Sequence, residues 1–305
     1  MTRLAFPGFI LAAVAAIMWG TAGTAQTFIT STTLSPLWVG ALRIVFACLF
    51  FYPILFLRPD SSQSSHKTQG SGKNNYLLKV LAAGGCMAMF NLLFFTGVKI
   101  SGVALGSCTI IASAPVWAGV LEAVIKRKFP DHLWLIGVGV AIAGGIWMAI
   151  SQASNIEVSF FGLGICLVAG FFYASYSLLA KELVLLTTPL RASAHSFSVA
   201  AVIALCAAWI FSDFPEILFQ DMLIVLYLGV AVTGIAYLLY GTALKTTRVS
   251  TCVALGLLEP VTAFILAITV VRESVNPWAT LGLIAILAGL ALVLKSEQKQ
   301  KSIAD

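Results

Sequence analysis

The chain has 305 residues, of which 60% are hydrophobic and only 10% are charged, and its mean hydropathy is +0.99. Soluble domains carry about 25% charged residues, so this composition excludes a soluble protein and indicates a polytopic membrane protein surrounded by lipid. The net charge of +6 comes from basic residues scattered through short loops, which argues against a nucleic-acid partner and instead carries information about membrane topology.

Hydropathy along the chain predicts ten helices that span the membrane, since about 20 apolar residues cross a hydrocarbon core of about 30 Å. Residues 1–26 imitate a signal peptide, but cleavage would leave an odd number of spans, so we interpret them as an uncleaved first helix. The spans are expected at residues 6–29, 36–57, 76–98, 103–125, 133–150, 160–179, 192–211, 222–243, 249–271 and 277–294.

Basic residues gather on one side of this predicted topology. With the N-terminus in the cytoplasm, fifteen Lys and Arg residues fall on the cytoplasmic side, against Lys99 and Arg272 on the other. This bias predicts a multi-pass protein of the cell inner membrane with both termini in the cytoplasm. Residues 58–75 are rich in Ser, Gly and Lys and are predicted to form a flexible cytoplasmic linker, and residues 296–305 a cytoplasmic tail.

Polar residues inside the early spans are candidates for a binding site. Arg43 lies seven residues into the second span, about 10 Å deep by helical rise. Its planar guanidinium could hold a substrate carboxylate, or the side chain could extend to the outer interface. Asn91 in the third span and His195 in the seventh could line a cavity, although hydrogen bonding between helices is the commoner role.

Six aromatic residues could form the wall of such a cavity and stack on organic cations or rings. Taken singly, each is more often a packing or interface residue. They are Trp19, Trp117, Tyr173, Tyr176, Tyr237 and Tyr240.

The fourth and fifth spans carry two further patterns. Glu122 stands one helical turn before Lys126, which favours an ion pair between them. Gly137, Ala141 and Gly145 form a face of small residues suited to close helix packing. This face could pack within one chain or against a second copy in a homodimer, and the pattern does not decide which.

Cysteines and histidines give no sign of a metal or cofactor. The six cysteines all fall in apolar stretches without a CxxC pair, so we expect them to be packing residues. The three histidines are dispersed, and His66 in the predicted linker has no second histidine at ligand spacing. We therefore expect neither a metal site nor a cofactor.

The ninth span contains the strongest candidate. Its one acid, Glu259, lies near the expected bilayer midplane, where a carboxylate costs roughly 2.5–3.5 kcal/mol and normally faces a protein interior or a wet cavity. Pro260 follows and should free the carbonyl oxygen of Gly256 to bind a ligand or cation. Glu259 could bind an amine and carry a proton; alternatively, it stays protonated and donates a hydrogen bond between helices. Pro115 should free the Ile111 carbonyl similarly, which suggests paired hinges or a simple kink.

An internal repeat relates the two halves. Residues 115–147 superimpose on 260–292 with a constant offset of 145, which pairs Pro115 with Pro260, Arg127 with Arg272, Gly137 with Gly282 and Gly144 with Gly289. Five spans per copy is an odd number, so the second copy must be inverted in the membrane. We predict an all-α membrane protein of two inverted five-helix repeats, residues 1–151 and 152–295.

Several short motifs carry a family resemblance: Trp19-Gly20, Arg43, Ala114-Pro115-Val116, Leu258-Glu259-Pro260-Val261 and Val271-Arg272-Glu273. They resemble the drug/metabolite transporter superfamily, in particular its ten-helix EamA type of permease, over nearly the whole chain. The resemblance implies a helical basket with a central cavity that exports amino acids or other small metabolites, against protons or by exchange. Residues 126–128, Lys-Arg-Lys, depart from the Gly-Glu pair that tends to close the fourth helix in the family.

These observations favour a secondary transporter for a small-molecule substrate, such as an amino acid or amine. No ATP-binding loop is present, so transport would draw on a proton gradient or on exchange. An intramembrane enzyme would need a nucleophile with a base, paired acids or a ligand cluster, whereas Glu259 is the one clearly deep acid. An antiporter of phosphorylated or nucleotide-linked metabolites would need two or more midplane cations, and Arg43 is the lone candidate.

Overall fold

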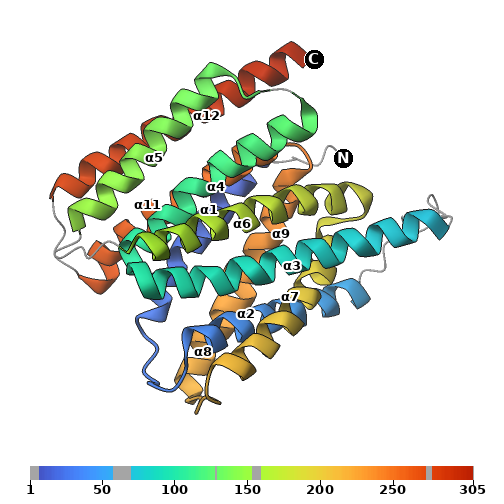
Figure 1. Cartoon of the computed structure of the whole chain (residues 1–305), viewed down its shortest axis with the longest axis vertical. Helices are drawn as coiled ribbons and strands as arrows, with labels where there is room; N and C mark the ends of the chain where they lie inside the picture. Colours follow the sequence, from blue (N-terminus) through green and yellow to red (C-terminus); the bar gives the residue numbers. More distant parts are fainter. Residues whose placement is uncertain (1–6, 58–69, 128, 153–158, 273–276, 305) are drawn as a thin grey trace.

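The structure is a computed structural model that describes residues 7–57, 70–127, 129–152, 159–272 and 277–304 (Figure 1). These residues contain ten helical spans long and apolar enough to cross a membrane, which confirms the predicted fold class. Lipid offers the backbone no hydrogen-bond partners, so each span must satisfy its own N–H and C=O groups as a helix. The helices are α1 (Gly8–Gln26), α2 (Pro36–Leu57), α3 (Gly70–Ser101), α4 (Val103–Lys126), α5 (His132–Gln152), α6 (Phe160–Leu186), α7 (Pro189–Phe211), α8 (Phe219–Tyr227), the π-helix η2 (Leu228–Ile235), α9 (Ala236–Leu244), α10 (Val249–Leu255), α11 (Leu258–Leu266), the π-helix η3 (Ala267–Val271) and α12 (Pro277–Ala304).

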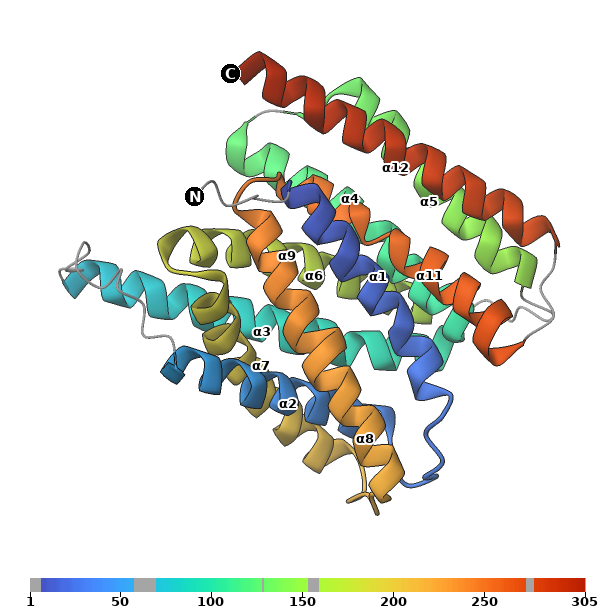
Figure 2. The same cartoon turned by 180° about the vertical axis from the view of Figure 1, so that it is seen from behind.

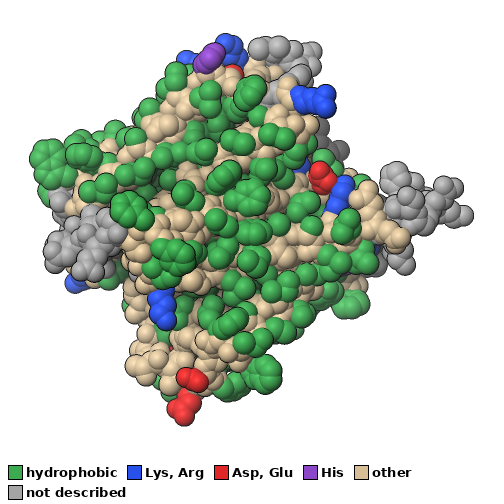
Figure 3. Space-filling model, viewed as in Figure 1, with side chains coloured by type: hydrophobic (Ala, Val, Ile, Leu, Met, Phe, Trp, Pro, Cys, Tyr) green, Lys and Arg blue, Asp and Glu red, His purple; other side chains and the backbone are tan. Residues whose placement is uncertain are grey.

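Large apolar side chains cover the outside of the bundle. Figure 3 shows them spread over the whole face, with charged side chains near its margins. Trp209 and Phe211 on α7 and Phe160 on α6 are each more than 70% exposed. Such a surface would aggregate in water, but it is the surface that lipid requires. The chain is therefore a multi-pass membrane protein.

Both chain ends lie at the same end of the bundle, which we call the termini side (Figures 1 and 2). Of the predicted linker, residues 58–69 lie outside the described residues, while residues 70–75 are helical because α3 begins at Gly70. The predicted tail is also helical up to Ala304, since α12 continues past the apolar segment. Extending an existing helix fixes one residue for each hydrogen bond gained, so polar residues readily prolong it.

Helices α5 and α12 lie side by side along the bundle (Figure 1) and cross at two pairs of glycines. A Cβ atom on Gly137 would lie 2.7 Å from the carbonyl oxygen of Gly289, and one on Gly144 would lie 2.6 Å from that of Gly282. The repeat offset of 145 pairs Gly137 with Gly282 and Gly144 with Gly289, so it converts the first contact into the second. The two sides of a two-fold interface are related in this way. The pairing is antiparallel, which agrees with two inverted repeats.

The small-residue face of α5 is therefore occupied within the chain. Gly137 and Ala141 contact α12 as that pattern allowed, but the second crossing uses Gly144 instead of Gly145. A Cβ atom on Gly145 would meet Cys108 of α4 at 3.9 Å, so Gly145 points toward α4. Because α12 covers it, this face is not available to a second copy of the chain.

Two arginines repeat the same unusual backbone geometry. Arg127 ends α4 with φ of 53°, and Arg272 ends η3 with φ of 61°. Within the described ranges these are the non-glycine residues with positive φ, a region that L-residues visit at a cost and that commonly terminates helices. They are separated by the offset of 145, so the repeat extends to backbone conformation.

Candidate functional site

The ninth span is broken in its middle. Helix α10 ends at Leu255 and α11 begins at Leu258, with Gly256 and Leu257 joining them in a tight turn. Pro260 then falls in the first turn of α11, where a missing N–H leaves no hydrogen bond unmade. Pro260 therefore belongs to the first turn of a second helix, and it does not interrupt a continuous one.

The carbonyl oxygen of Gly256 is not left free, contrary to the prediction. It accepts a hydrogen bond of 2.9 Å from the backbone N–H of Glu259, because the chain tightens to three-residue spacing across the turn. Helix α4, by contrast, continues through Pro115 without a break. The two prolines therefore lie in different local structures, one inside a continuous helix and one beside a break, and a hinge at each stays a prediction.

A cluster of five aromatic rings, which we call the aromatic cluster, fills the centre of the bundle. Its ring centroids lie 5.0 Å apart for Trp19 and Tyr237, 5.3 Å for Trp19 and Tyr240, and 6.2 Å for Trp19 and Tyr173. Tyr176 joins through Tyr237 at 6.0 Å. All five side chains are at least nine-tenths buried. Helices α1, α6 and α9 thus supply a closed aromatic centre where the family resemblance implied an open cavity.

Hydrogen bonding in the cluster is incomplete. The Tyr240 hydroxyl donates to Ser177 Oγ at 2.9 Å, and Ser177 donates to the Tyr173 carbonyl. The Trp19 indole N–H is buried without a hydrogen-bond partner among the described residues. An unmatched buried donor costs roughly 1–3 kcal/mol, and such groups are concentrated at functional sites.

Arg43 of α2 lies beside this cluster rather than at the membrane interface. Its Nη2 atom donates to Asn91 Oδ1 at 3.3 Å, and Asn91 Nδ2 donates to the Gly40 carbonyl at 3.3 Å. Asn91 therefore bonds between helices, as expected, and also orients the guanidinium. The Arg43 Nε–H is buried and has no hydrogen-bond partner within the described chain.

Glu259 of α11 shares the electrostatic environment of Arg43 and Tyr237, since each of these groups acts on the charge of the others. No hydrogen bond or ion pair reaches the Glu259 side chain from the described residues. Helix α1 approaches closely here: a Cβ atom on Gly20 would lie 2.5 Å from the Glu259 carbonyl oxygen. One cation and one acid therefore stand near each other without a direct contact.

Two other sequence candidates lie elsewhere. Trp117 donates from its indole to the Leu167 carbonyl at 3.0 Å and packs on Phe171, between α4 and α6, so it is not part of the aromatic cluster. His195 Nδ1 lies 2.7 Å from the Tyr76 hydroxyl and joins α7 to α3, as expected of a residue that links helices.

Sequence reasoning missed the π-helix η2, which passes beside Arg43. A Cβ atom on Gly229 would lie 2.9 Å from the Arg43 carbonyl oxygen, and Thr233 Oγ1 donates to the Leu228 carbonyl five residues earlier. Such segments are frequent at functional sites. The signal available in the sequence was a threonine between Gly229 and Gly234 in an otherwise apolar run.

Glu122 also makes a contact that sequence reasoning missed. Its side chain is 6% exposed and accepts a hydrogen bond of 3.0 Å from the backbone N–H of Ser250, at the start of α10. The Lys126 side chain lies outside the described residues, so the proposed ion pair stays a prediction. Glu122 binds a helix N-terminus because the exposed N–H groups there attract a carboxylate.

Comparison with known proteins places this geometry in a family. Residues 6–150 and 160–295 each match the EamA-like transporter family. This chain belongs to that family. An uncharacterized transporter of Bacillus subtilis (strain 168), YwfM, is 32% identical over 289 residues, which cover 95% of this chain and 94% of that protein. An uncharacterized transporter of Clostridium kluyveri is 26% identical over 145 residues, 46% of this chain and 47% of that protein.

A solved crystal structure has the same fold as this chain. It superimposes with a TM-score of 0.79 over 96% of this chain and 98% of its own length, at 16% sequence identity. At that identity the likeness concerns the fold alone. The family and the named relatives make this chain a membrane transporter.

Proposed function

We propose that this EamA-family protein is a secondary transporter for a small polar metabolite, such as an amino acid or amine. The observation that carries the proposal is one cation and one acid beside the aromatic cluster: Arg43 bonds to Asn91 but has an unpaired Nε–H, and the Glu259 side chain has no partner among the described residues. Two opposite charges that interact without forming an ion pair are suited to a molecule with both an anionic and a cationic group. The carboxylate of the substrate would bind Arg43, and its ammonium would bind Glu259.

The aromatic cluster gives this site its selectivity. Tyr237 and Trp19 present ring faces and edges to an ammonium or an apolar side chain, which is how aromatic residues bind organic cations. The unpaired Trp19 N–H supplies one further donor. Phosphorylated substrates fit less well, because Arg43 would be their one strong cation.

Transport in this proposal follows alternating access between the two inverted repeats. Glu259 lies in the broken span and binds either the substrate ammonium or a proton, so the two compete and transport becomes proton-coupled efflux or exchange. The bias of basic residues supports a cytoplasmic position for the termini side in this proposal, with the protein in the cell inner membrane.

The test is a panel of metabolites in reconstituted vesicles. Amino acids are compared with the amines that lack their carboxylate and with the acids that lack their amine, at two pH values, for the wild type and Glu259→Gln. We expect the zwitterions, or the amines, to be counter-transported with a dependence on pH that Glu259→Gln removes. Undiminished, pH-dependent transport by Glu259→Gln would contradict the assigned role of this carboxylate.

A further inference from the structure

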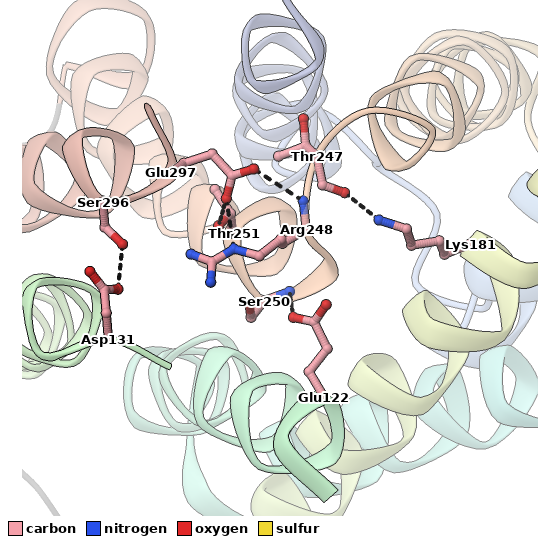
Figure 4. A network of polar contacts seen from close by, with 9 residues as sticks. All are labelled: Glu122, Asp131, Lys181, Thr247, Arg248, Ser250, Thr251, Ser296 and Glu297. Carbon is pink, nitrogen blue, oxygen red and sulfur yellow. Dashed lines mark hydrogen bonds and ion pairs between the residues drawn. The ribbon is translucent and has the colours of Figure 1, made fainter. Parts of the chain in front are cut away.

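Two buried carboxylates hold the first turn of α10 at the termini side (Figure 4). Glu297 of α12 accepts hydrogen bonds from Arg248 Nε at 2.9 Å and from Thr251 Oγ1 at 2.7 Å. Glu122 of α4 accepts from the Ser250 N–H at 3.0 Å. The Glu122 and Glu297 side chains come from opposite repeats, and we call this pair the α10 clamp.

The neighbouring contacts converge on the same short segment. Lys181 of α6 donates from Nζ to the Thr247 carbonyl at 2.7 Å, one residue before Arg248 (Figure 4). Ser296, next to Glu297 on α12, donates to the Asp131 carboxylate. Helices α4, α6 and α12 therefore bind the start of α10, while Ser296 ties α12 to the residue before α5, and breaking the clamp would free several bonds together.

Helix α10 connects this clamp to the candidate substrate site. All seven residues from Val249 to Leu255 are buried, and the helix ends at the turn of Gly256 and Leu257, directly before Glu259. A short rigid helix with a break at one end can turn about that break. Movement of α10 at the clamp would therefore shift the position of Glu259.

The opposite end of the bundle is closed by a different set of bonds. Asp221 of α8 is fully buried and accepts from the Thr30 N–H at 2.9 Å and the Ser31 N–H at 3.0 Å. Trp38 Nε1 donates to the Asp213 carbonyl at 2.8 Å nearby. Polar contacts thus close both ends, and an alternating mechanism requires that each end open in turn.

We propose that Glu122 and Glu297 form the gate on the termini side: release of α10 from these carboxylates lets α10 turn about Gly256–Leu257 and opens the path from the cytoplasm to Glu259. This gate rests on the proposed transport function. Both residues act as positioning residues through α10, and neither touches the substrate. Release is feasible because water can satisfy the two carboxylates and the freed N–H donors once the end opens.

Cys252 offers a probe that needs no substrate. It lies in α10, is 1% exposed, and acts electrostatically on Tyr240 of the aromatic cluster. The experiment keeps Cys252 and replaces the remaining cysteines with serine or alanine: Cys48, Cys86, Cys108, Cys166 and Cys206. Full-length protein in sealed vesicles of known orientation is then labelled with a membrane-impermeant maleimide from the termini side.

We expect slow labelling of Cys252 in the parent and labelling roughly tenfold faster in Glu122→Ala and in Glu297→Ala, since loss of a buried cap shifts a two-state equilibrium by about that factor. Glu122→Gln keeps an oxygen that can accept from Ser250, so it should label at the parent rate. The matched control is Glu182→Ala, which breaks an exposed ion pair with Lys79 at the same end.

Thr251→Val provides a milder variant, which removes one donor to Glu297 and should accelerate labelling by about twofold to threefold. Unchanged labelling in both alanine variants, or equal acceleration by Glu182→Ala, would overturn the gate. Because labelling needs no substrate, failure of the metabolite panel would leave this result standing. Faster labelling with pH-independent transport would instead support the gate and count against the role of Glu259.

Discussion

Helix α4 and the ninth span are copies of one sequence that adopt two different structures. Both contain the proline of the repeat, Pro115 and Pro260, and both end at an arginine with positive φ. Helix α4 nevertheless runs unbroken, while the ninth span divides into α10 and α11. The difference lies in the residues before the proline, where Ile111 and Ala114 of the first copy correspond to Gly256 and Glu259 of the second.

This difference shows how one copy can serve as scaffold and the other as site. A glycine one turn before a proline lowers the helical preference of the chain at that point, and the backbone separates there. The acid then stands at the start of α11, where the helix N-terminus favours a negative charge. The corresponding residue of α4 is Ala114, which is buried and has no polar or ionisable group.

The largest effect should come from replacing Glu259, because the first repeat has an alanine at the corresponding position. Glu259→Gln should reduce substrate-driven proton exchange by roughly 100-fold, since the amide can neither carry a proton nor pair with the substrate ammonium, and loss of such a charged contact costs about 2–5 kcal/mol. Counter-transport in vesicles across a pH series measures it. Glu182→Gln, which removes an exposed carboxylate, is the control and should leave transport unchanged. A Glu259→Gln protein that keeps its pH dependence would remove the functional distinction between the two copies.

The two prolines should respond differently to the same substitution. Pro260→Ala restores an N–H at the break and favours a continuous helix, so we expect transport to fall by about tenfold. Pro115→Ala lies in a helix that is already continuous and should change transport by less than about twofold. Initial rates in vesicles, normalised to reconstituted protein, compare the pair. Equal losses would show that α4 also bends during transport.

The glycine crossings of α5 and α12 should control stability. Gly137→Ala places a methyl group against the α12 backbone and should destabilise the protein by about 1–3 kcal/mol. Gly139→Ala, on the same helix, meets nothing within 4 Å and should be neutral or stabilising by up to about 1 kcal/mol. Thermal unfolding in detergent separates them, and similar midpoints for the two variants would argue that this crossing is loose.

The smallest effect concerns a feature that the two repeats share, the arginine with positive φ at a helix end. Arg127→Gly and Arg272→Gly relieve the positive φ at both helix ends and should each stabilise the protein by about 1 kcal/mol relative to Arg127→Ala and Arg272→Ala. The alanine variants remove the charge but keep the Cβ atom, so the difference isolates backbone strain. Thermal unfolding of the four proteins provides the measurement, and a gain at one arginine alone would mean that the two turns carry unequal strain.

Much of the fold followed from composition, because the membrane allows few alternatives to helices and ten long apolar runs fix their number. The offset of 145 predicted the inversion, which the crossed contacts of Gly137 and Gly144 agree with. A hinge or kink at Pro260 was expected, but the bond that closes the Gly256 carbonyl was not. Local hydrogen bonds of this kind depend on backbone geometry that residue types do not specify.

The site was harder to predict than the fold. Trp19, Tyr173, Tyr176 and Tyr237 do meet, whereas Trp117 lies apart, and aromatic residues of these two kinds look alike in an apolar sequence. The hydrogen bond between Glu122 and Ser250 joins residues 128 positions apart, so neighbouring sequence, which indicated Lys126 as a partner, could not reveal it. Contacts between the repeats depend on how the two halves pack against each other, and short sequence motifs carry no information about that packing.

The crossed glycines of α5 and α12 also restrict how the halves can rearrange. Sliding one helix along the other would carry both crossings out of register at once and drive side chains into backbone, so translation along this seam is blocked. Rotation about the line through the two crossings preserves both. The two crossings therefore favour rotation of the halves about this seam over sliding along it.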